Sequence, residues 1–80
     1  MRENDQLLKE LLEEVFLVDD DTYKDEYGPD EIEGWDSLAT VSMAVAVHET
    51  FDHHMRPDEV AEIRTIGDIK AFLRGKGVEI

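Results

Sequence analysis

A serine at the entrance to an apolar segment is the residue in this sequence best placed for chemistry. It lies in the run Gly34-Trp35-Asp36-Ser37-Leu38, where a polar, glycine-containing stretch meets a run of aliphatic residues. Asp36 can accept hydrogen bonds from the first free N–H groups of a helix. Ser37 would then lie in the first turn with its hydroxyl in solvent, and Leu38 would point inward. A phosphate ester on that hydroxyl would lie near unpaired N–H donors and the positive end of the helix dipole. The arrangement suits a serine that is modified rather than one that attacks, although a plain helix cap would show the same triplet.

A serine hydrolase is the rival explanation from the class of enzymes. Such an enzyme needs a histidine base and an oxyanion hole around Ser37. The sequence contains no nucleophile elbow, and 80 residues are too few to enclose a substrate. We therefore expect no enzymatic activity and no catalytic residues.

Two further groups of residues raise the question of a metal. His48, His53 and His54 are not spaced to share one helical face, and the sequence has no cysteine to support them. Asp19 could begin a calcium loop of the EF-hand type, but Lys24 and Asp30 stand where glycine and glutamate are required. We expect surface histidines and no structured metal site, while weak divalent binding to the acidic segment stays open.

The charge of the chain limits its partners. The sequence has 21 acidic and 8 basic residues, a formal net charge of −13, which would repel nucleic acid. Residues 19–36 alone carry nine acids and one lysine, which makes them either a solubilising surface or a docking face for basic proteins. The N-terminal segment is not of signal-peptide type, and no run approaches the roughly 20 apolar residues of a membrane span. We expect a cytoplasmic monomer.

The elements that position Ser37 are predicted to be helical. A first helix capped by Asn4 or Asp5 shows apolar residues on one face and ends near Val18. A long loop, residues 19–36, follows, with Gly28 and Gly34 marking turns. Four aromatic or aliphatic side chains could pin this loop to the helices: Tyr23, Tyr27, Ile32 and Trp35.

Three more helices complete the prediction. The segment from Asp36 or Ser37 to about Phe51 is apolar on most sides, so we expect a well-buried helix. A short helix begins at Pro57 and runs to about Ile63. A capping box formed by Thr65 and Asp68 opens the last helix, which Gly75 ends, and the tail 75–80 is expected to be loose. The expected fold is one all-α domain over residues 1–80 with its core at about 4–74: a four-helix bundle with a short third helix.

At this point the chain resembles the acyl carrier protein family, including the related peptidyl carrier domains. The family has an Asp-Ser-Leu triplet at the start of the second of four helices, after a long loop, and Asp36-Ser37-Leu38 matches it. The resemblance covers roughly residues 4–73. Further matches lie at Phe51-Asp52, Pro57-Asp58-Glu59, Ala61-Glu62-Ile63 and Thr65-Ile66.

The resemblance implies a function and a set of residues. Ser37 would receive 4′-phosphopantetheine from coenzyme A through a Mg²⁺-dependent phosphopantetheinyl transferase, with Asp36 and Leu38 beside the group. Its thiol would carry an acyl or aminoacyl group as a thioester in fatty-acid, polyketide or a related biosynthesis. Contact with acyl-loading and acyl-processing enzymes that have basic docking faces would fall to Trp35, Asp36, Leu38, Val41, Ser42, Met43, His48 and Glu49. The cavity for short acyl chains would be lined by Val41, Val47, Ile63 and Ile66, with Leu38, although each of these could equally be a core residue.

The second helix departs from the family pattern. Ser42 and His48 stand where members often have acids. We therefore expect partner recognition to rely on the acidic loop and on apolar residues, in a carrier dedicated to one pathway. The alternative is an acidic helical interaction module that carries no prosthetic group.

Overall fold

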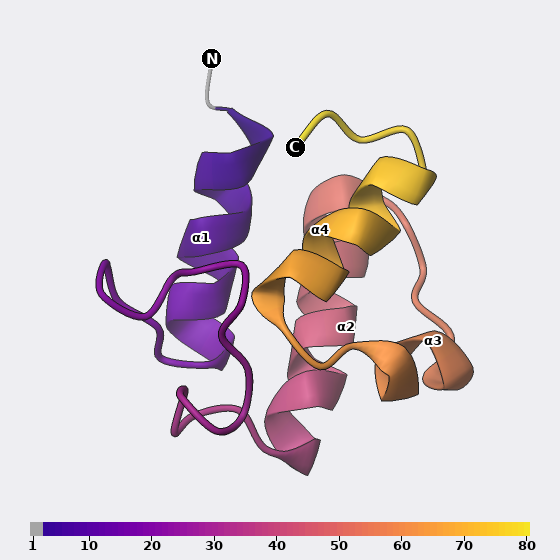
Figure 1. Ribbon diagram of the computed structural model, residues 1–80. Coiled ribbons are helices and arrows are strands. Elements are labelled where there is room, and N and C mark those ends of the chain that lie inside the picture. The colour runs from indigo at the N-terminus through magenta and orange to yellow at the C-terminus, as the bar shows by residue number, and fades with distance from the viewer. Residues whose placement is uncertain (1–2) are drawn as a thin grey trace.

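The computed structural model describes residues 3–80 and confirms the all-α fold. It contains four helices, α1 (Asn4–Val15), α2 (Ser37–Phe51), α3 (Pro57–Glu62) and α4 (Ile66–Gly75), and no strand within the described part of the chain. In Figure 1, α1 runs towards the lower end of the molecule, the long loop crosses that end, and α2 returns upward beside α1. None of these four helices is long and apolar enough to cross a membrane.

The core is one cluster of apolar side chains drawn from three helices and the loops between them. Its fully buried members include residues of α1, α2 and α4, while α3 contributes no buried residue of its own. The largest fully buried side chains are Phe16, Leu8, Leu12, Met43, Ile66, Ile69, Leu73 and Val47. The predicted loop anchors also join the core, because Ile32 and Trp35 are buried and Tyr23 and Tyr27 pack against it half-buried.

The predicted starts of three helices are confirmed, two of them by a capping hydrogen bond. The Asp36 carboxylate accepts a hydrogen bond from the N–H of Ala39 at 2.8 Å and so begins α2. Pro57 stands in the first turn of α3. The Thr65 hydroxyl accepts from the N–H of Asp68 at 3.1 Å and begins α4, but the capping box is only half formed, since the Asp68 carboxylate accepts from the N–H of Arg64 instead of Thr65.

The start of α1 was predicted wrongly. Its N-cap is Glu3, and no side chain caps it. Asn4 and Asp5 are engaged elsewhere: the Asn4 amide donates to the carbonyl of Glu79 at 3.0 Å, and Asp5 accepts from the Tyr23 hydroxyl at 2.8 Å. Both side chains therefore reach partners far along the chain, and neither oxygen caps the first N–H groups of α1.

The predicted end of α1 needs correction, whereas that of α4 is right in position but involves a different glycine. α1 ends at Val15 and not near Val18, because the chain turns at Leu17, which has a φ of 59°. α4 includes Gly75, and the left-handed residue that ends it is Gly77, with a φ of 89°. The N–H groups of Gly77 and Val78 donate to the carbonyls of Arg74 and Leu73, both at 3.0 Å, as in a Schellman motif.

The tail is held and not loose. The Arg74 guanidinium donates through Nε to the carbonyl of Ile80 at 2.7 Å, and Glu79 accepts from Asn4. Val78 and Ile80 pack against the core. The C-terminus therefore lies beside the beginning of α1, as Figure 1 shows at its upper end.

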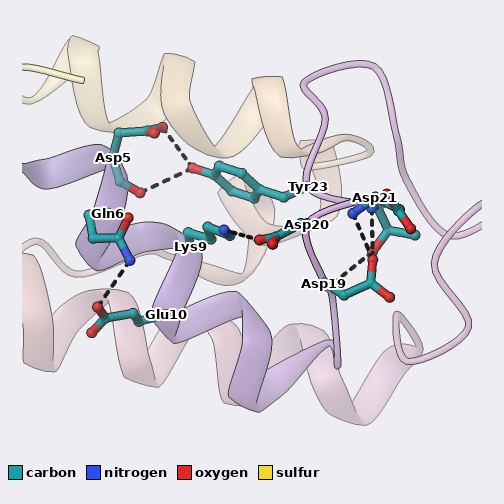
Figure 2. Close-up of polar contacts among 9 residues, drawn as sticks. Asp5, Gln6, Lys9, Glu10, Asp19, Asp20, Asp21 and Tyr23 are labelled. Atoms are coloured by element: carbon teal, nitrogen blue, oxygen red, sulfur yellow. Dashed lines mark hydrogen bonds and ion pairs between the residues drawn. The ribbon is translucent and has the colours of Figure 1, made fainter.

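Polar contacts fix the acidic loop onto α1 and α4. Figure 2 shows the Tyr23 hydroxyl between α1 and the loop, donating to the carboxylate and the carbonyl of Asp5, and Lys9 paired with Asp20. The Lys70 ammonium of α4 lies 2.7 Å from a carboxylate oxygen of Asp25 and 3.1 Å from one of Asp5. The segment is thus a packed connection between helices.

These contacts shift the pKa values of the groups that make them. Burial raises the pKa of Asp5, but hydrogen bonds from Tyr23 and Lys70 and the positive charges of Lys70 and Lys9 outweigh it, so the pKa is lowered overall. For Lys70, burial lowers the pKa, and the carboxylates of Asp25 and Asp5 more than compensate, so it is raised. Burial, followed by the bond to Asp5, strongly raises the pKa of Tyr23. At neutral pH, Asp5 is therefore negatively charged, Lys70 is positively charged and Tyr23 is neutral.

Candidate functional site

Ser37 is the first residue of α2, and its side chain is exposed. Its carbonyl accepts from the Thr40 hydroxyl at 2.8 Å, whereas its own hydroxyl makes no hydrogen bond with another of residues 3–80. Asp36 satisfies the N–H of Ala39 with its carboxylate and that of Thr40 with its carbonyl at 2.9 Å. The first N–H groups of a helix have no partner inside it, and those of Ser37 and Leu38 make no hydrogen bond with another of residues 3–80.

The turn before Ser37 is fixed by packing against the end of α1. A Cβ atom added at Gly34 would lie 2.1 Å from the carbonyl oxygen of Phe16, so only glycine permits this approach. The Trp35 ring is stacked on that of Phe16, with centroids 4.3 Å apart. Trp35 is only 6% exposed, and it is therefore a core residue and not the partner contact that the sequence predicted.

The exposed face of α2 includes large apolar residues, which corrects the prediction of a well-buried helix. Leu38 is 82% exposed and points outward, not inward, and Val41 and Val45 are also exposed. Only Met43 and Val47 of this helix are buried. A helix with neighbours on one side cannot bury apolar residues all around, and a domain of this size buries only about 60% of its surface.

The other predicted partner contacts divide between surface and core. Met43 is fully buried, because it faces the core from the opposite side of the helix to Leu38 and Val41, so it cannot contact a partner. The side chains of Asp36, Ser42, His48 and Glu49 are exposed.

A groove of about 590 Å³ runs between α2 and α3, and its walls are mainly apolar. Val41 of α2 and Val60 of α3 both line the groove. The complete lining is Val41, Ala44, Val45, His48, Glu49, His54, Met55, Pro57, Val60 and Ala61. The other four predicted cavity residues do not line it. Leu38 is exposed outside it, Val47 and Ile66 are fully buried in the core, and Ile63 borders a separate depression between α3 and α4.

Sequence reasoning missed most of this groove. Val45 belongs to the apolar pattern of α2, but a pattern that is apolar on most sides does not indicate which side meets α3. Met55 and His54 come from the loop after α2, and their place follows only from the fold. The His48 and His54 rings lie at the groove with centroids 5.7 Å apart and an angle of 74° between their planes.

The histidines and the aspartates do not gather into a metal centre in the described residues. No group of three histidine or carboxylate side chains within residues 3–80 is arranged to hold a metal ion. The Asp19 carboxylate instead accepts from the N–H groups of Asp21 and Thr22, at 2.9 and 3.0 Å. These bonds, drawn in Figure 2, make it the cap of its own turn.

Comparison with known proteins decides the family. No protein-family model matches the chain. An acyl carrier protein of Bdellovibrio bacteriovorus is 30% identical to it over 70 residues, which cover 88% of this chain and 90% of that protein. The chain belongs to the acyl carrier protein family.

Membership of this family makes the chain a carrier and not an enzyme. The Ser37 hydroxyl is exposed, as an attachment point for a carried group must be. The carrier differs from the expected pattern along α2, where residues 37–48 contain no acid. Its acids are instead concentrated in residues 19–36, directly before Ser37.

Proposed function

We propose that this carrier holds a 4′-phosphopantetheine arm on the hydroxyl of Ser37 and transports acyl or aminoacyl groups as thioesters. The observation that supports the proposal most is the exposed Ser37 hydroxyl, which no other residue of the described chain uses. The arm supplies a thiol, which the chain itself lacks because it has no cysteine.

The residues around Ser37 suit a phosphate ester. The N–H groups of Ser37 and Leu38 are free to face a phosphate at the positive end of the α2 dipole. In the transfer, the Ser37 oxygen forms a bond to phosphorus and the pyrophosphate bond of coenzyme A breaks. Adenosine 3′,5′-bisphosphate leaves, and the hydroxyl proton passes to a base on the transferase.

The groove between α2 and α3 is the proposed shelter for the acyl group. Val41 stands four residues after Ser37, a rise of about 6 Å along the helix. From there the groove offers apolar walls over about 590 Å³. In this proposal Val41 keeps its predicted role, and Val45 and Val60 replace the buried Val47 and Ile66.

The partners are proposed to be enzymes of one dedicated pathway. The absence of acids from residues 37–48 supports this, since general docking through a basic surface would find little charge on α2 itself. Nine acids in residues 19–36 would meet basic partner surfaces instead. Offering the loaded carrier to purified enzymes of general fatty-acid synthesis tests the proposal, and efficient elongation would contradict it.

The attachment site is tested by incubating the protein with coenzyme A, Mg²⁺ and a broad-specificity transferase. Intact-mass spectrometry should show a gain of about 340 Da, the mass that the esterified group adds. The chain has two serines, both on α2 and both exposed, so Ser37→Ala should abolish the gain and Ser42→Ala should retain it. An unmodified interaction module would gain nothing in any variant.

A further inference from the structure

The groove between α2 and α3 has a polar end, which is the end farther from Ser37. Along α2, the lining begins with Val41 and finishes with His48 and Glu49. His54, from the loop after α2, belongs to the same end, because its ring lies edge-on to that of His48 with centroids 5.7 Å apart. A group anchored on Ser37 and lying in the groove would therefore pass apolar walls before it reached polar side chains.

The fold does not use the polar side chains at this end. His48, Glu49 and His54 are exposed, and within residues 3–80 their side chains make no hydrogen bond or ion pair. A carboxylate oxygen and an imidazole nitrogen can each accept a hydrogen bond from a cationic donor. Their hydrogen-bonding capacity is thus available to a group that enters the groove.

The charge at the polar end favours a cation. Among the described residues that line the groove, Glu49 is the only acid, and none is a lysine or an arginine that could pair with a carboxylate. His48 and Glu49 also lie in the last turn of α2, where the helix dipole places partial negative charge. The beginning of this helix therefore suits a phosphate, and its end suits an ammonium group.

The length of helix between Ser37 and His48 matches the reach of the proposed arm. Eleven residues of α2 separate the two, which is a rise of about 16 Å. Roughly 14 bonds lead from the Ser37 oxygen to the sulfur of a 4′-phosphopantetheine group, or about 16 Å when they are extended. An arm that follows α2 would bring its thioester level with the polar end of the groove.

We infer that the carried group is an amino acid with an apolar side chain, whose α-ammonium group binds Glu49 with His48 and His54 beside it. This deepens the proposed function and rests on it. The ammonium group of an aminoacyl thioester lies two bonds from the thioester carbon, so it would reach the polar end together with the thioester. The apolar side chain would contact Val45 and Met55, which line the groove next to the two histidines. A plain acyl group offers no cation to these side chains, and Glu49 would repel a carboxylate.

The test compares two carried groups that differ only in the amine. A broad-specificity transferase attaches either a leucyl or a 4-methylpentanoyl arm to Ser37 from coenzyme A derivatives in which a stable amide replaces the thioester. The pKa of the leucyl amine is then measured by NMR titration. A neighbouring carboxylate raises the pKa of an ammonium group, so Glu49→Gln should lower it by about 0.5, as expected for the loss of one exposed ion pair.

Asp52→Asn is the matched control for the charge. Asp52 follows α2 and is exposed, but it does not line the groove, and asparagine tolerates its left-handed φ of 59°. Its substitution removes the same charge and should lower the pKa of the amine by less than about 0.2. Melting curves of both variants should show that they are folded, because both side chains are exposed.

The histidine rings give a second, independent readout. The ring resonances of His48 and His54 should differ between the leucyl and the 4-methylpentanoyl forms, whereas those of His53, which does not line the groove, should coincide. Equal effects of Glu49→Gln and Asp52→Asn on the pKa of the amine, or identical rings of His48 and His54 in the two forms, would overturn the inference. If intact mass shows that the wild type takes neither arm, the proposed function fails and the inference with it.

Discussion

The rings of Trp35 and Phe16 lie nearly parallel, with an angle of 9° between their planes and 4.3 Å between their centroids. Phe16 closes α1, and Trp35 stands two residues before Ser37. This stack therefore joins the end of one helix to the turn that presents the candidate attachment site.

Removing the indole should destabilise the protein and disorder that turn. Trp35→Ala should lower the free energy of unfolding by about 3–5 kcal/mol, measured by urea denaturation, because it opens a large cavity in the core. Trp35→Phe keeps an aromatic ring on Phe16 and should lose less. A loss below about 1 kcal/mol for Trp35→Ala would contradict the assignment of Trp35 to the core.

Two glycines of this chain should respond in opposite ways to a methyl group. At Gly34 the added Cβ would lie 2.1 Å from the Phe16 carbonyl oxygen, so Gly34→Ala should destabilise the fold and slow the modification of Ser37. At Gly75, in the last turn of α4, nothing lies within 4 Å of the added atom. Gly75→Ala should raise the stability by up to about 0.5–1 kcal/mol through helix propensity. Thermal melts of both variants test this difference. Equal losses of stability in Gly34→Ala and Gly75→Ala would contradict it.

Leu38 and Met43 make a second contrasting pair, on opposite faces of α2. Leu38→Ala should change the free energy of unfolding by no more than about 0.5 kcal/mol, since the side chain is exposed. Met43→Ala should cost about 2–5 kcal/mol, since that side chain is fully buried. The rate of Ser37 modification by the transferase should show the opposite order. Measured at low temperature, where both variants are folded, it should fall more for Leu38→Ala than for Met43→Ala. A large loss of stability for Leu38→Ala would contradict the assignment of Leu38 to the surface.

The ion pairs that hold the acidic loop predict a pH dependence of stability. The pKa of Asp5 is lower in the folded protein than its ordinary value, chiefly through Tyr23 and Lys70 against the opposing effect of burial. The stabilisation by its carboxylate is therefore present above about pH 4 and is lost as the pH falls through the folded pKa. The difference in stability between wild type and Asp5→Asn should be below about 1 kcal/mol at pH 7, because the carboxylate is half-exposed, and should vanish once the pH falls below the folded pKa.

Asp30→Asn is the control for that series. It removes the same charge from the same acidic surface, but Asp30 forms no ion pair with another of residues 3–80. It should therefore report the general relief of repulsion in a protein with a net charge of −13. If Asp5→Asn and Asp30→Asn gave the same pH profile, the loop would not be held by the contact of Asp5 with Lys70 and Tyr23.

Local chemistry made much of the fold predictable from the sequence. Asp36, Pro57 and Thr65 each begin a helix through a bond or a backbone angle that depends only on near neighbours. The position and exposure of Ser37 were predictable for the same reason.

Long-range contacts explain the errors. Asn4 was expected to cap α1, but its amide reaches Glu79 at the far end of the chain. The tail was expected to be loose because its sequence does not show that Ile80 can accept from Arg74. The face that α2 buries could not be predicted, since both faces are apolar and only the packing of α1 and α3 distinguishes Met43 from Leu38.

The central claim is that Ser37 carries an acyl group through a prosthetic arm, and intact-mass analysis of the protein from its own growing cells tests it most directly. We expect a species heavier than the bare chain by more than about 340 Da, which neutral hydroxylamine reduces to that value by cleaving the thioester. Proteolytic fragments should place the remaining mass on Ser37. A native protein found only at the mass of its unmodified polypeptide, or with the adduct on Ser42, would contradict the account.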